Sequence, residues 1–216
     1  MKKKLVIFDL DGTLLNTIDD LAMGANHALA VLGYPTHDAA TIRSFVGNGI
    51  NKLLERALPE GEKTEENILC MRSVFIPYYD EHNTDLTVPY EGVPELLVRL
   101  QKEGVQLAVA SNKYQAATEK LVAHFFPNIN FVKVLGQRSD VPIKPDPAIV
   151  TDILKVAGVG QDAVLYVGDS GVDMLTALNA QVDAVGVTWG FRPKLELSTF
   201  PSLGLIDKAE ELLNYI

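Results

Sequence analysis

The sequence predicts an α/β protein with a doubly wound parallel sheet and an α-helical domain inserted after the first strand. From residue 89 to residue 187, strand-like apolar runs alternate with helical patterns, as in consecutive βαβ units with helices on both faces of a parallel sheet. Residues 5–8 form a similar apolar run near the start of the chain. Between residues 17 and 83 only helical patterns occur, which indicates a separate helical insertion.

The first strand is predicted at residues 5–8, because a run of four apolar residues is typical of a strand buried on both faces. It ends at Asp9, and Asp11, Gly12 and Thr13 follow. Side chains alternate along an extended backbone, so the carboxylates of Asp9 and Asp11 are expected on one side of the strand end. A cation such as Mg²⁺ would offset their repulsion. The alternative is an Asx turn that caps the following segment.

Four helices are predicted in the insertion. The first runs from Thr17 to Leu32, with apolar residues at a helical period, Thr17 as its N-cap and Gly33 after its end. Three more helical segments are expected at residues 38–45, 50–58 and 63–82. They are separated by glycine- and proline-containing breaks at 47–49 and 59–61.

The remaining elements are expected to complete the core. The predicted strands are residues 105–110, 131–135, 164–168 and 184–187, and the predicted helices are residues 93–103, 114–125, 146–157 and 173–180. We therefore assign residues 1–16 and 85–216 to an α/β core domain and residues 17–84 to the inserted helical domain.

Composition excludes several classes of protein. A formal net charge of −9 argues against nucleic-acid binding and against attachment to an anionic membrane. The apolar run after the basic start is too short for a secretion signal or a membrane span. Cys70 is the only cysteine, so no internal disulfide forms. We expect a cytoplasmic protein, monomeric or weakly dimeric, whose partner is a small molecule and neither a nucleic acid nor a membrane.

Polar residues follow two of the later strands, and one lysine lies in an unusual local frame. Ser111 and Asn112 follow the strand at 105–110, at the expected start of a helix, where backbone N–H groups bind anions; a simple N-cap is the alternative. Lys144 lies between two prolines, which restrict its backbone. Asp169 and Asp173 follow the strand at 164–168, one helical turn apart.

The four aspartates at positions 9, 11, 169 and 173 would converge if their two strands are neighbours in the sheet. Clustered carboxylates raise one another's pKa values and cost stability. Mg²⁺ accepts oxygen ligands from several carboxylates and leaves room for a substrate phosphate. We therefore expect these aspartates to hold Mg²⁺ where the two strands end.

In this order the motifs resemble those of the haloacid dehalogenase superfamily: DxDGT at residues 9–13, a strand-end serine at 111, a lysine at 144, and GDxxxD at residues 168–173. The resemblance covers the whole chain and implies a Rossmann-like core with a helical cap at the position of the insertion. It implies that Asp9 is the nucleophile that forms an aspartyl-phosphate, and that Asp11 is the general acid and base.

The resemblance also implies how the ligands are bound. Ser111 and Lys144 would bind the transferring phosphoryl group. Asp9, the main-chain carbonyl of Asp11, and Asp169 would hold Mg²⁺, with Asp173 in support. An acid at position 11 favours attack on phosphorus over attack on carbon, because an alkoxide leaving group needs a proton.

Further residues are expected to bind the substrate. In the core these are Thr13 and Asn112. In the cap, Arg43 and Asn48 lie beside the glycine break and are expected to bind the charged end of the substrate, although a solvated arginine is the alternative. Tyr79, at the end of the last cap helix, is expected to pack in the core or at the hinge; a position that faces the site is the alternative.

Four segments are also similar to phosphoglycolate phosphatases: residues 44–49, 111–113, 168–174 and 189–192. The resemblance implies a Mg²⁺-dependent phosphatase that hydrolyses 2-phosphoglycolate. The alternatives within enzymes are a phosphatase of another sugar phosphate or of pyrophosphate, and a phosphomutase of the β-phosphoglucomutase type. An alternative of another class is a phosphate-responsive binding module like a receiver domain, which would need neither Asp11 nor a cap.

Overall fold

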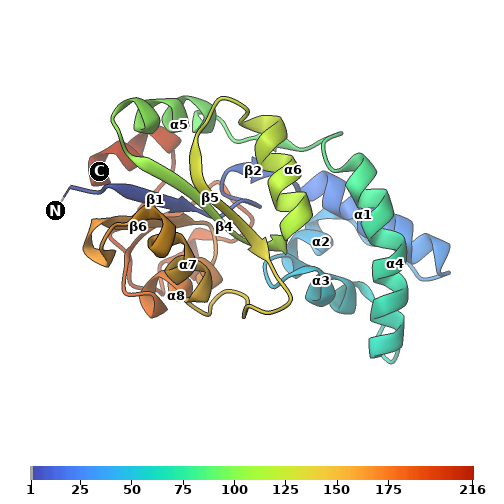
Figure 1. The fold of residues 1–216 in the computed structure, drawn as a ribbon. Helices are drawn as coiled ribbons and strands as arrows, with labels where there is room; N and C mark the ends of the chain where they lie inside the picture. The colour runs from blue at the N-terminus through green and yellow to red at the C-terminus, as the bar shows by residue number, and fades with distance from the viewer. Residues whose placement is uncertain (1) are drawn as a thin grey trace.

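The computed structural model describes residues 2–216. Figure 1 shows an α/β core, which carries both ends of the chain, and a helical cap on the side away from them. Met1, which the expected core domain includes, lies outside the described residues.

The core is built around a six-stranded sheet in the order β5-β4-β1-β6-β7-β8, in which all neighbouring strands are parallel. The strands are β1 (Leu5–Phe8), β4 (Gln106–Tyr114), β5 (Phe131–Gln137), β6 (Val164–Gly168), β7 (Asp183–Val187) and β8 (Gly204–Ile206). The predicted parallel α/β sheet is confirmed. Because β1 lies between β4 and β6, the segments that follow these three strands meet at one edge of the sheet.

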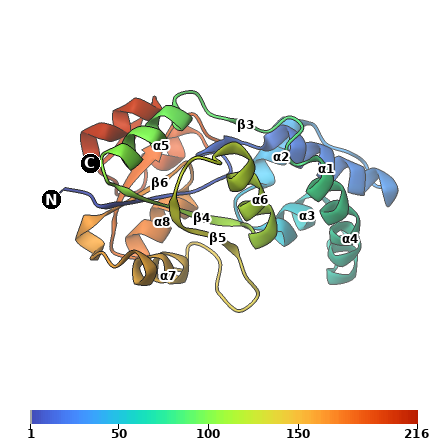
Figure 2. The ribbon, with the colours of Figure 1, turned by 45° about the horizontal axis from the view of Figure 1, so that its top comes forward.

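Helices cover both faces of the sheet, as the burial of every β1 side chain requires. Val6 and Phe8 belong to the apolar layer on one face, and Leu5 and Ile7 to the layer on the other. The first face is covered by α5 (Val93–Lys102), α6 (Gln115–Phe125) and the 3₁₀ helix η2 (Ala209–Tyr215). The second is covered by α7 (Ala148–Ala157), α8 (Gly171–Asn179) and α9 (Lys194–Leu197). Figure 2 shows α5 and α7 on opposite sides of the strands.

The cap consists of α1 (Ile18–Val31), α2 (Ala39–Phe45), α3 (Ile50–Ala57) and α4 (Glu65–His82). These helices enclose an apolar cluster of their own, which also includes Ala117 of α6. A Cβ atom at Gly24 would lie 2.9 Å from the Phe75 ring, so the glycine permits α1 and α4 to approach closely. The short antiparallel strands β2 (Leu15–Asn16) and β3 (Val88–Pro89) pair where the chain enters and leaves the cap. The exact division at residues 16 and 84 stays a prediction.

Hydrogen bonds join the cap to the core on several sides. The Tyr114 hydroxyl donates to the Asp80 carboxylate of α4, and the Lys120 ammonium donates to the Asp80 carbonyl. Asn112 Nδ2 donates to the Gly47 carbonyl at 3.0 Å. The cap therefore lies against the carboxyl edge of the sheet.

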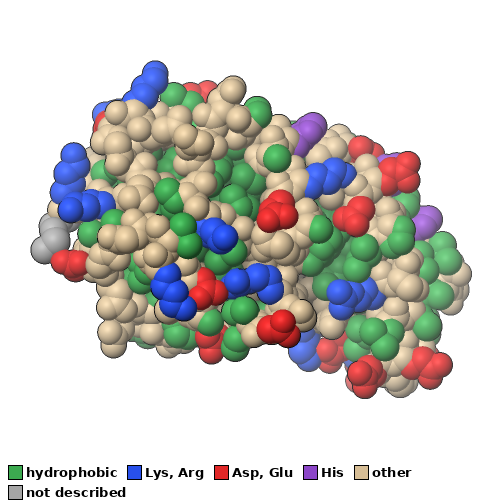
Figure 3. Space-filling model, in the orientation of Figure 1, with side chains coloured by type: hydrophobic (Ala, Val, Ile, Leu, Met, Phe, Trp, Pro, Cys, Tyr) green, Lys and Arg blue, Asp and Glu red, His purple; other side chains and the backbone are tan. Residues whose placement is uncertain are grey.

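On the face shown in Figure 3, acidic and basic side chains are interspersed, and no basic stripe of the kind that binds nucleic acid covers it. None of the helices within residues 2–216 is long and apolar enough to cross a membrane.

Candidate active site

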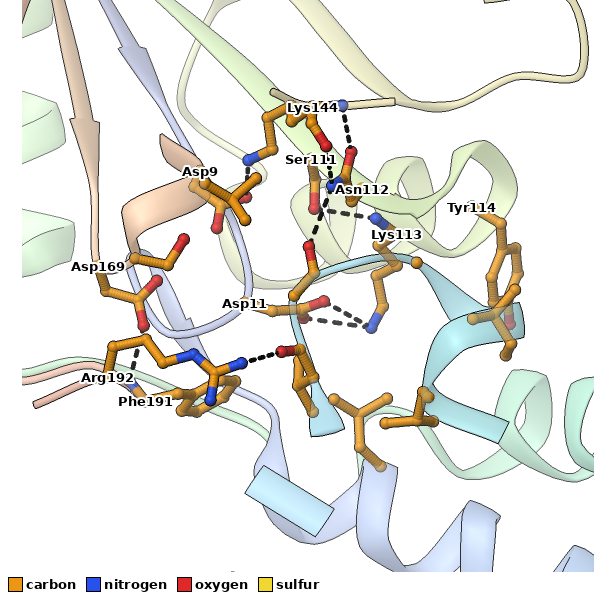
Figure 4. A pocket seen from close by; sticks show the side chains of 18 of the residues that line it. Asp9, Asp11, Ser111, Asn112, Lys113, Tyr114, Lys144, Asp169, Phe191 and Arg192 are labelled. Carbon is orange, nitrogen blue, oxygen red and sulfur yellow. Dashed lines mark hydrogen bonds and ion pairs between the residues drawn. The ribbon is translucent and has the colours of Figure 1, made fainter. Parts of the chain in front are cut away.

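The carboxyl ends of β1, β4 and β6 and the facing side of the cap enclose one charged cavity (Figure 4). The acidic and basic side chains that line it are those of Asp9, Asp11, Asp169, Lys113, Lys144 and Arg192. The cap contributes an apolar wall and exposed backbone, from Val46, Gly47, Gly49, Ile50, Leu53, Phe75 and Tyr79. The core side of the cavity is therefore charged, and the cap side is mainly apolar.

Lys144 connects the carboxyl end of β1 to the first turn of α8. Its ammonium lies 2.8 Å from Asp9 Oδ1 and 2.7 Å from Asp173 Oδ1, and it also donates to the Ala110 carbonyl and the Tyr166 hydroxyl. The side chain is only 2% exposed. A buried lysine with four oxygen partners is held in one position, so Lys144 places a fixed positive charge beside Asp9.

The pKa shifts show that this lysine does not balance the acidic groups around it. Burial raises the pKa of Asp9 to about 7, the charge of Asp173 adds to the shift, and Lys144 only partly opposes it. Burial and the charge of Asp173 also raise the pKa of Asp169 well above its usual range. For Lys144, burial acts to lower the pKa, but the charges of Asp173 and Asp9 outweigh it and raise the pKa. The cluster therefore favours a further cation.

Three of the four predicted acidic residues form this cluster. Asp9, Asp169 and Asp173 each offer a carboxylate oxygen, and these oxygens lie within 4.8 Å of one another. All three side chains are buried. Buried carboxylate oxygens without nitrogen or sulfur donors suit a hard divalent cation, so the residues fit a metal ion.

Hydrogen bonds orient the individual carboxylates. Asp169 Oδ2 accepts from the Phe191 N–H at 2.6 Å, and Asp169 Oδ1 accepts from the Thr13 hydroxyl at 3.3 Å. Asp173 Oδ2 accepts from both the N–H and the hydroxyl of Ser170, in a capping box at the start of α8. Asp173 also pairs through Oδ1 with the Lys144 ammonium, whereas each Asp169 oxygen accepts from one neutral donor and Asp9 is bonded through Oδ1 alone. Asp9 and Asp169 are therefore the better placed metal ligands, and Thr13 acts here on Asp169.

The Asp11 side chain lies apart from the cluster, so the expectation that four carboxylates converge is wrong for this residue. Its oxygens lie 3.1 and 3.2 Å from Lys113 Nζ, and Oδ1 accepts from the Thr17 hydroxyl at 2.8 Å. Thr17 was expected to cap the first helix, but its side chain makes no capping bond to α1. It is instead bonded to Asp11, six residues earlier.

Lys113 is a site residue that sequence reasoning missed. Ser111 and Asn112 were expected at a helix start, but β4 continues to Tyr114 and α6 begins only at Gln115. In an extended segment, residues 111 and 113 share one side. The period-two pattern would have pointed to Lys113 if the strand had been extended through these polar residues.

Ser111 and Asn112 both lie at the cavity, where hydrogen bonds hold them. Ser111 Oγ accepts from the Lys113 N–H at 3.2 Å. Asn112 Oδ1 accepts from the Lys144 N–H at 2.8 Å, and its Nδ2 donates to the carbonyls of Lys144 and Gly47. Asn112 therefore fixes the Lys144 backbone and attaches it to the cap. Its expected contact with substrate stays a prediction.

The cap residues expected to bind substrate are not among the described residues that line the cavity. Arg43 is exposed, and Asn48 Oδ1 accepts from Arg56 at 2.9 Å. Their role stays a prediction. Tyr79, expected to serve packing, does line the cavity, and its ring centroid lies 4.6 Å from Lys113 Nζ.

The loop after β7 reaches both the acidic cluster and the cap. Phe191 donates to Asp169, and the adjacent Arg192 donates to the cap carbonyls of Ser44 and Val46. A Cβ atom at Gly190 would lie 2.3 Å from the Cβ of Asp169, so only glycine fits there. Figure 4 shows Arg192 at the cavity beside Asp169, on the side away from Lys113.

Comparison with known proteins agrees with this geometry. Residues 6–187 match the family model described as haloacid dehalogenase-like hydrolase. The phosphoglycolate phosphatase of Psychrobacter arcticus is 33% identical over 100% of this chain and 96% of its own length, and that of Mesorhizobium japonicum is 33% identical over 99% and 98%. The crystal structure of a predicted phosphoglycolate phosphatase from Haemophilus somnus 129PT superposes with a TM-score of 0.92 at 30% identity, covering 100% of this chain and 98% of that one.

Proposed function

Because this chain belongs to the haloacid dehalogenase-like hydrolase family and is a phosphatase of that family, we propose that it hydrolyses 2-phosphoglycolate to glycolate and phosphate, with Mg²⁺ as cofactor and through an aspartyl-phosphate on Asp9. The observation that carries the proposal is the separation of two carboxylates. Asp9 lies in the acidic cluster with Lys144, whereas Asp11 is held apart by Lys113 and Thr17. This separation supports attack by one carboxylate and proton transfer by the other.

In the first step the Asp9 carboxylate attacks phosphorus, and the bond between phosphorus and the ester oxygen breaks. Asp11 gives a proton to the departing oxygen, which would otherwise leave as a strongly basic alkoxide. Lys144, which contacts Asp9, and the Ser111 hydroxyl, which belongs to a residue that lines the same cavity, bind the phosphoryl oxygens. The negative charge of the phosphate therefore does not repel the nucleophile.

In the second step a water molecule attacks phosphorus of the aspartyl-phosphate. Asp11, now ionised, takes a proton from that water, and the bond between phosphorus and the Asp9 oxygen breaks to release phosphate. Asp9 and Asp169 and the main-chain carbonyl of Asp11 would hold Mg²⁺, with Asp173 in support, and the ion would withdraw charge from the phosphoryl oxygens.

Two observations support 2-phosphoglycolate as the substrate. Curated relatives that match over nearly their whole length are named phosphoglycolate phosphatase. The cavity is closed over by the cap and contains Lys113 and Arg192 beyond the acidic cluster, which suits a small substrate with a second anionic group.

A panel of phosphate esters assayed with Mg²⁺ tests the proposal. It contains 2-phosphoglycolate, ethyl phosphate, glucose phosphates and pyrophosphate, with phosphate release as the readout. Ethyl phosphate is the matched control, because it has the same chain length and lacks only the carboxylate. We expect kcat/KM for 2-phosphoglycolate to exceed that for ethyl phosphate by about tenfold or more, the scale of one charge-assisted contact. A higher value for pyrophosphate or a sugar phosphate, or conversion of a sugar phosphate without phosphate release, would refute the proposed substrate.

A further inference from the structure

We propose that Lys113 binds the carboxylate of the substrate's leaving group and so makes the enzyme specific for phosphate esters with an anionic group one carbon beyond the ester oxygen. The inference rests on the proposed function and deepens it by naming the residue that selects the substrate. It assigns this task to a core residue, in place of the cap residues Arg43 and Asn48.

The three cations that line the cavity have different numbers of partners. Lys144 has four oxygen partners, among them two carboxylates. Arg192 donates from both terminal nitrogens to carbonyls of the cap. Within residues 2–216, the hydrogen bonds of Lys113 Nζ go to a single carboxylate, that of Asp11. Lys144 is therefore fully engaged, whereas Lys113 and Arg192 both retain N–H donors. Of these two cations, Lys113 is the one whose ammonium contacts Asp11.

The geometry of the Lys113 contact supports this reading. Its distances to Asp11, 3.1 and 3.2 Å, are longer than the roughly 2.7–2.9 Å of tight charged pairs. An ammonium group has three N–H donors, so a second carboxylate can bind without displacing the first. Lys144 does the same in this site, since it contacts Asp9 and Asp173 together.

The position of Lys113 matches the chemistry of the leaving group. Asp11 gives its proton to the ester oxygen, so that oxygen lies beside Asp11 during the reaction. In 2-phosphoglycolate a single CH₂ group separates this oxygen from the carboxylate. Lys113, which touches Asp11, is thus placed to meet the carboxylate while phosphorus lies at Asp9.

The surroundings of Lys113 strengthen such a contact. The side chain is 3% exposed, and the buried Tyr79 ring of the cap lies against its ammonium. Ion pairs that are removed from water are stronger than surface pairs and less screened by salt. A lysine buried in the cavity discriminates a carboxylate from a methyl group better than the exposed Arg43 can.

The test compares two nonhydrolysable ligands by calorimetry with Mg²⁺ present, so that no catalytic step enters the result. They are 3-phosphonopropionate, in which CH₂ replaces the ester oxygen of 2-phosphoglycolate, and propylphosphonate, which lacks the carboxylate. We expect the wild type to bind 3-phosphonopropionate about tenfold or more tightly. Lys113→Met should bring the two affinities to within about threefold of each other.

Three further variants make the result specific. Lys113→Gln retains a donor for Asp11 without the charge and should also lose the preference, which guards against a folding defect in Lys113→Met; thermal melts check both. Lys133→Met removes an exposed lysine of β5 and should keep the full preference. Arg43→Ala should keep it as well.

The outcomes separate the two proposals. If the wild type has no preference for 3-phosphonopropionate, the proposed substrate class fails. If the wild type has the preference and folded Lys113→Met and Lys113→Gln retain it, the role of Lys113 is overturned. Loss of the preference in Arg43→Ala would overturn it too, in favour of the cap. Steady-state kinetics of the Lys113 variants provide a second test. If Lys113 has only a structural role, its substitution should lower kcat/KM for 2-phosphoglycolate and for ethyl phosphate equally.

Discussion

The ammonium of Lys144 lies 2.8 Å from Asp9 Oδ1, and both side chains are almost fully buried where β1 ends. The same ammonium contacts Asp173, and Asp169 lies alongside. One fixed cation therefore faces three buried carboxylates. This imbalance determines what substitutions, pH and metal ions should do to the protein.

Replacing Asp9 should separate activity from stability. Asp9→Asn removes the nucleophile but retains the shape of the side chain and relieves repulsion with Asp173, the charge that helps to raise the pKa of Asp9. We expect no steady phosphate release, and a Tm without metal equal to or above that of the wild type. Measurable turnover by a preparation free of wild-type enzyme would refute the aspartyl-phosphate mechanism.

Replacing Lys144 should instead destabilise the fold. Lys144→Met leaves the buried carboxylates of Asp9 and Asp173 without their partner, and breaking a buried pair in this way costs about 3–5 kcal/mol. Urea denaturation measures the loss. The matched control is Lys155→Met, which removes a lysine of a more exposed pair and should cost less than about 0.5 kcal/mol. Similar losses in both variants would contradict the argument.

The acidic cluster should also make metal stabilisation depend on pH. The pKa of Asp9 is raised to about 7 in the folded protein, against about 4 for an unfolded aspartate. Between these values the folded state binds more protons than the unfolded state, so the metal-free protein loses stability as pH rises through this window.

Metal binding requires the ionised carboxylate, so Mg²⁺ should raise Tm more at about pH 8 than at about pH 5.5. Differential scanning calorimetry with and without Mg²⁺ at both pH values measures the difference. An equal increase in Tm at both pH values would show that Asp9 does not bind the ion.

Phosphatase activity should vanish in excess chelator and return with added Mg²⁺.

Sequence reasoning succeeded where one strand and its end decide the outcome. An apolar run that ends in Asp9, and another that ends in Asp169 with Asp173 one turn later, lead to adjacent carboxylates once β1 and β6 pair. The parallel sheet was also predictable, because the alternation of strands and helices is a local pattern that can be read along the chain.

Long-range contacts were beyond such reasoning. Arg192 reaches Val46, which is 146 residues away in the chain, and no local pattern distinguishes it from Arg43. Lys113 was missed because the polar residues at 111–114 resemble a loop or helix start, yet they continue β4. There the tertiary structure overrides local propensity.

Replacing Asp11 should affect substrates according to their leaving groups. The Asp11 carboxylate is fixed by Thr17 and Lys113 away from the acidic cluster, in the position expected of a proton donor. Asp11→Asn should therefore slow phosphoryl transfer from 2-phosphoglycolate far more than from p-nitrophenyl phosphate, whose leaving group needs little protonation. Burst-phase kinetics measure the first step alone. Equal slowing of both substrates would argue against Asp11 as the acid.

Gly190 should control the position of Asp169 through packing alone. A Cβ atom there would lie 2.3 Å from Asp169 Cβ and 2.4 Å from the Gly12 carbonyl oxygen. Neither neighbour can move freely, because one is a side chain held by Phe191 and Thr13 and the other is backbone. Gly190→Ala must displace Asp169 or the loop itself, and such overpacking costs about 1–3 kcal/mol.

The consequence for function is a weaker metal site, because Asp169 is one of the two carboxylates best placed to hold the ion. Gly190→Ala should raise the Mg²⁺ concentration needed for half-maximal activity, with a smaller effect on kcat at saturating metal. The matched control is Gly160→Ala, where φ is −76° and the new methyl group meets only the end of the exposed Asp162 side chain. That variant should retain the wild-type Mg²⁺ dependence. If Gly190→Ala does so as well while losing stability, the loop after β7 supports the fold but does not position the metal ligand.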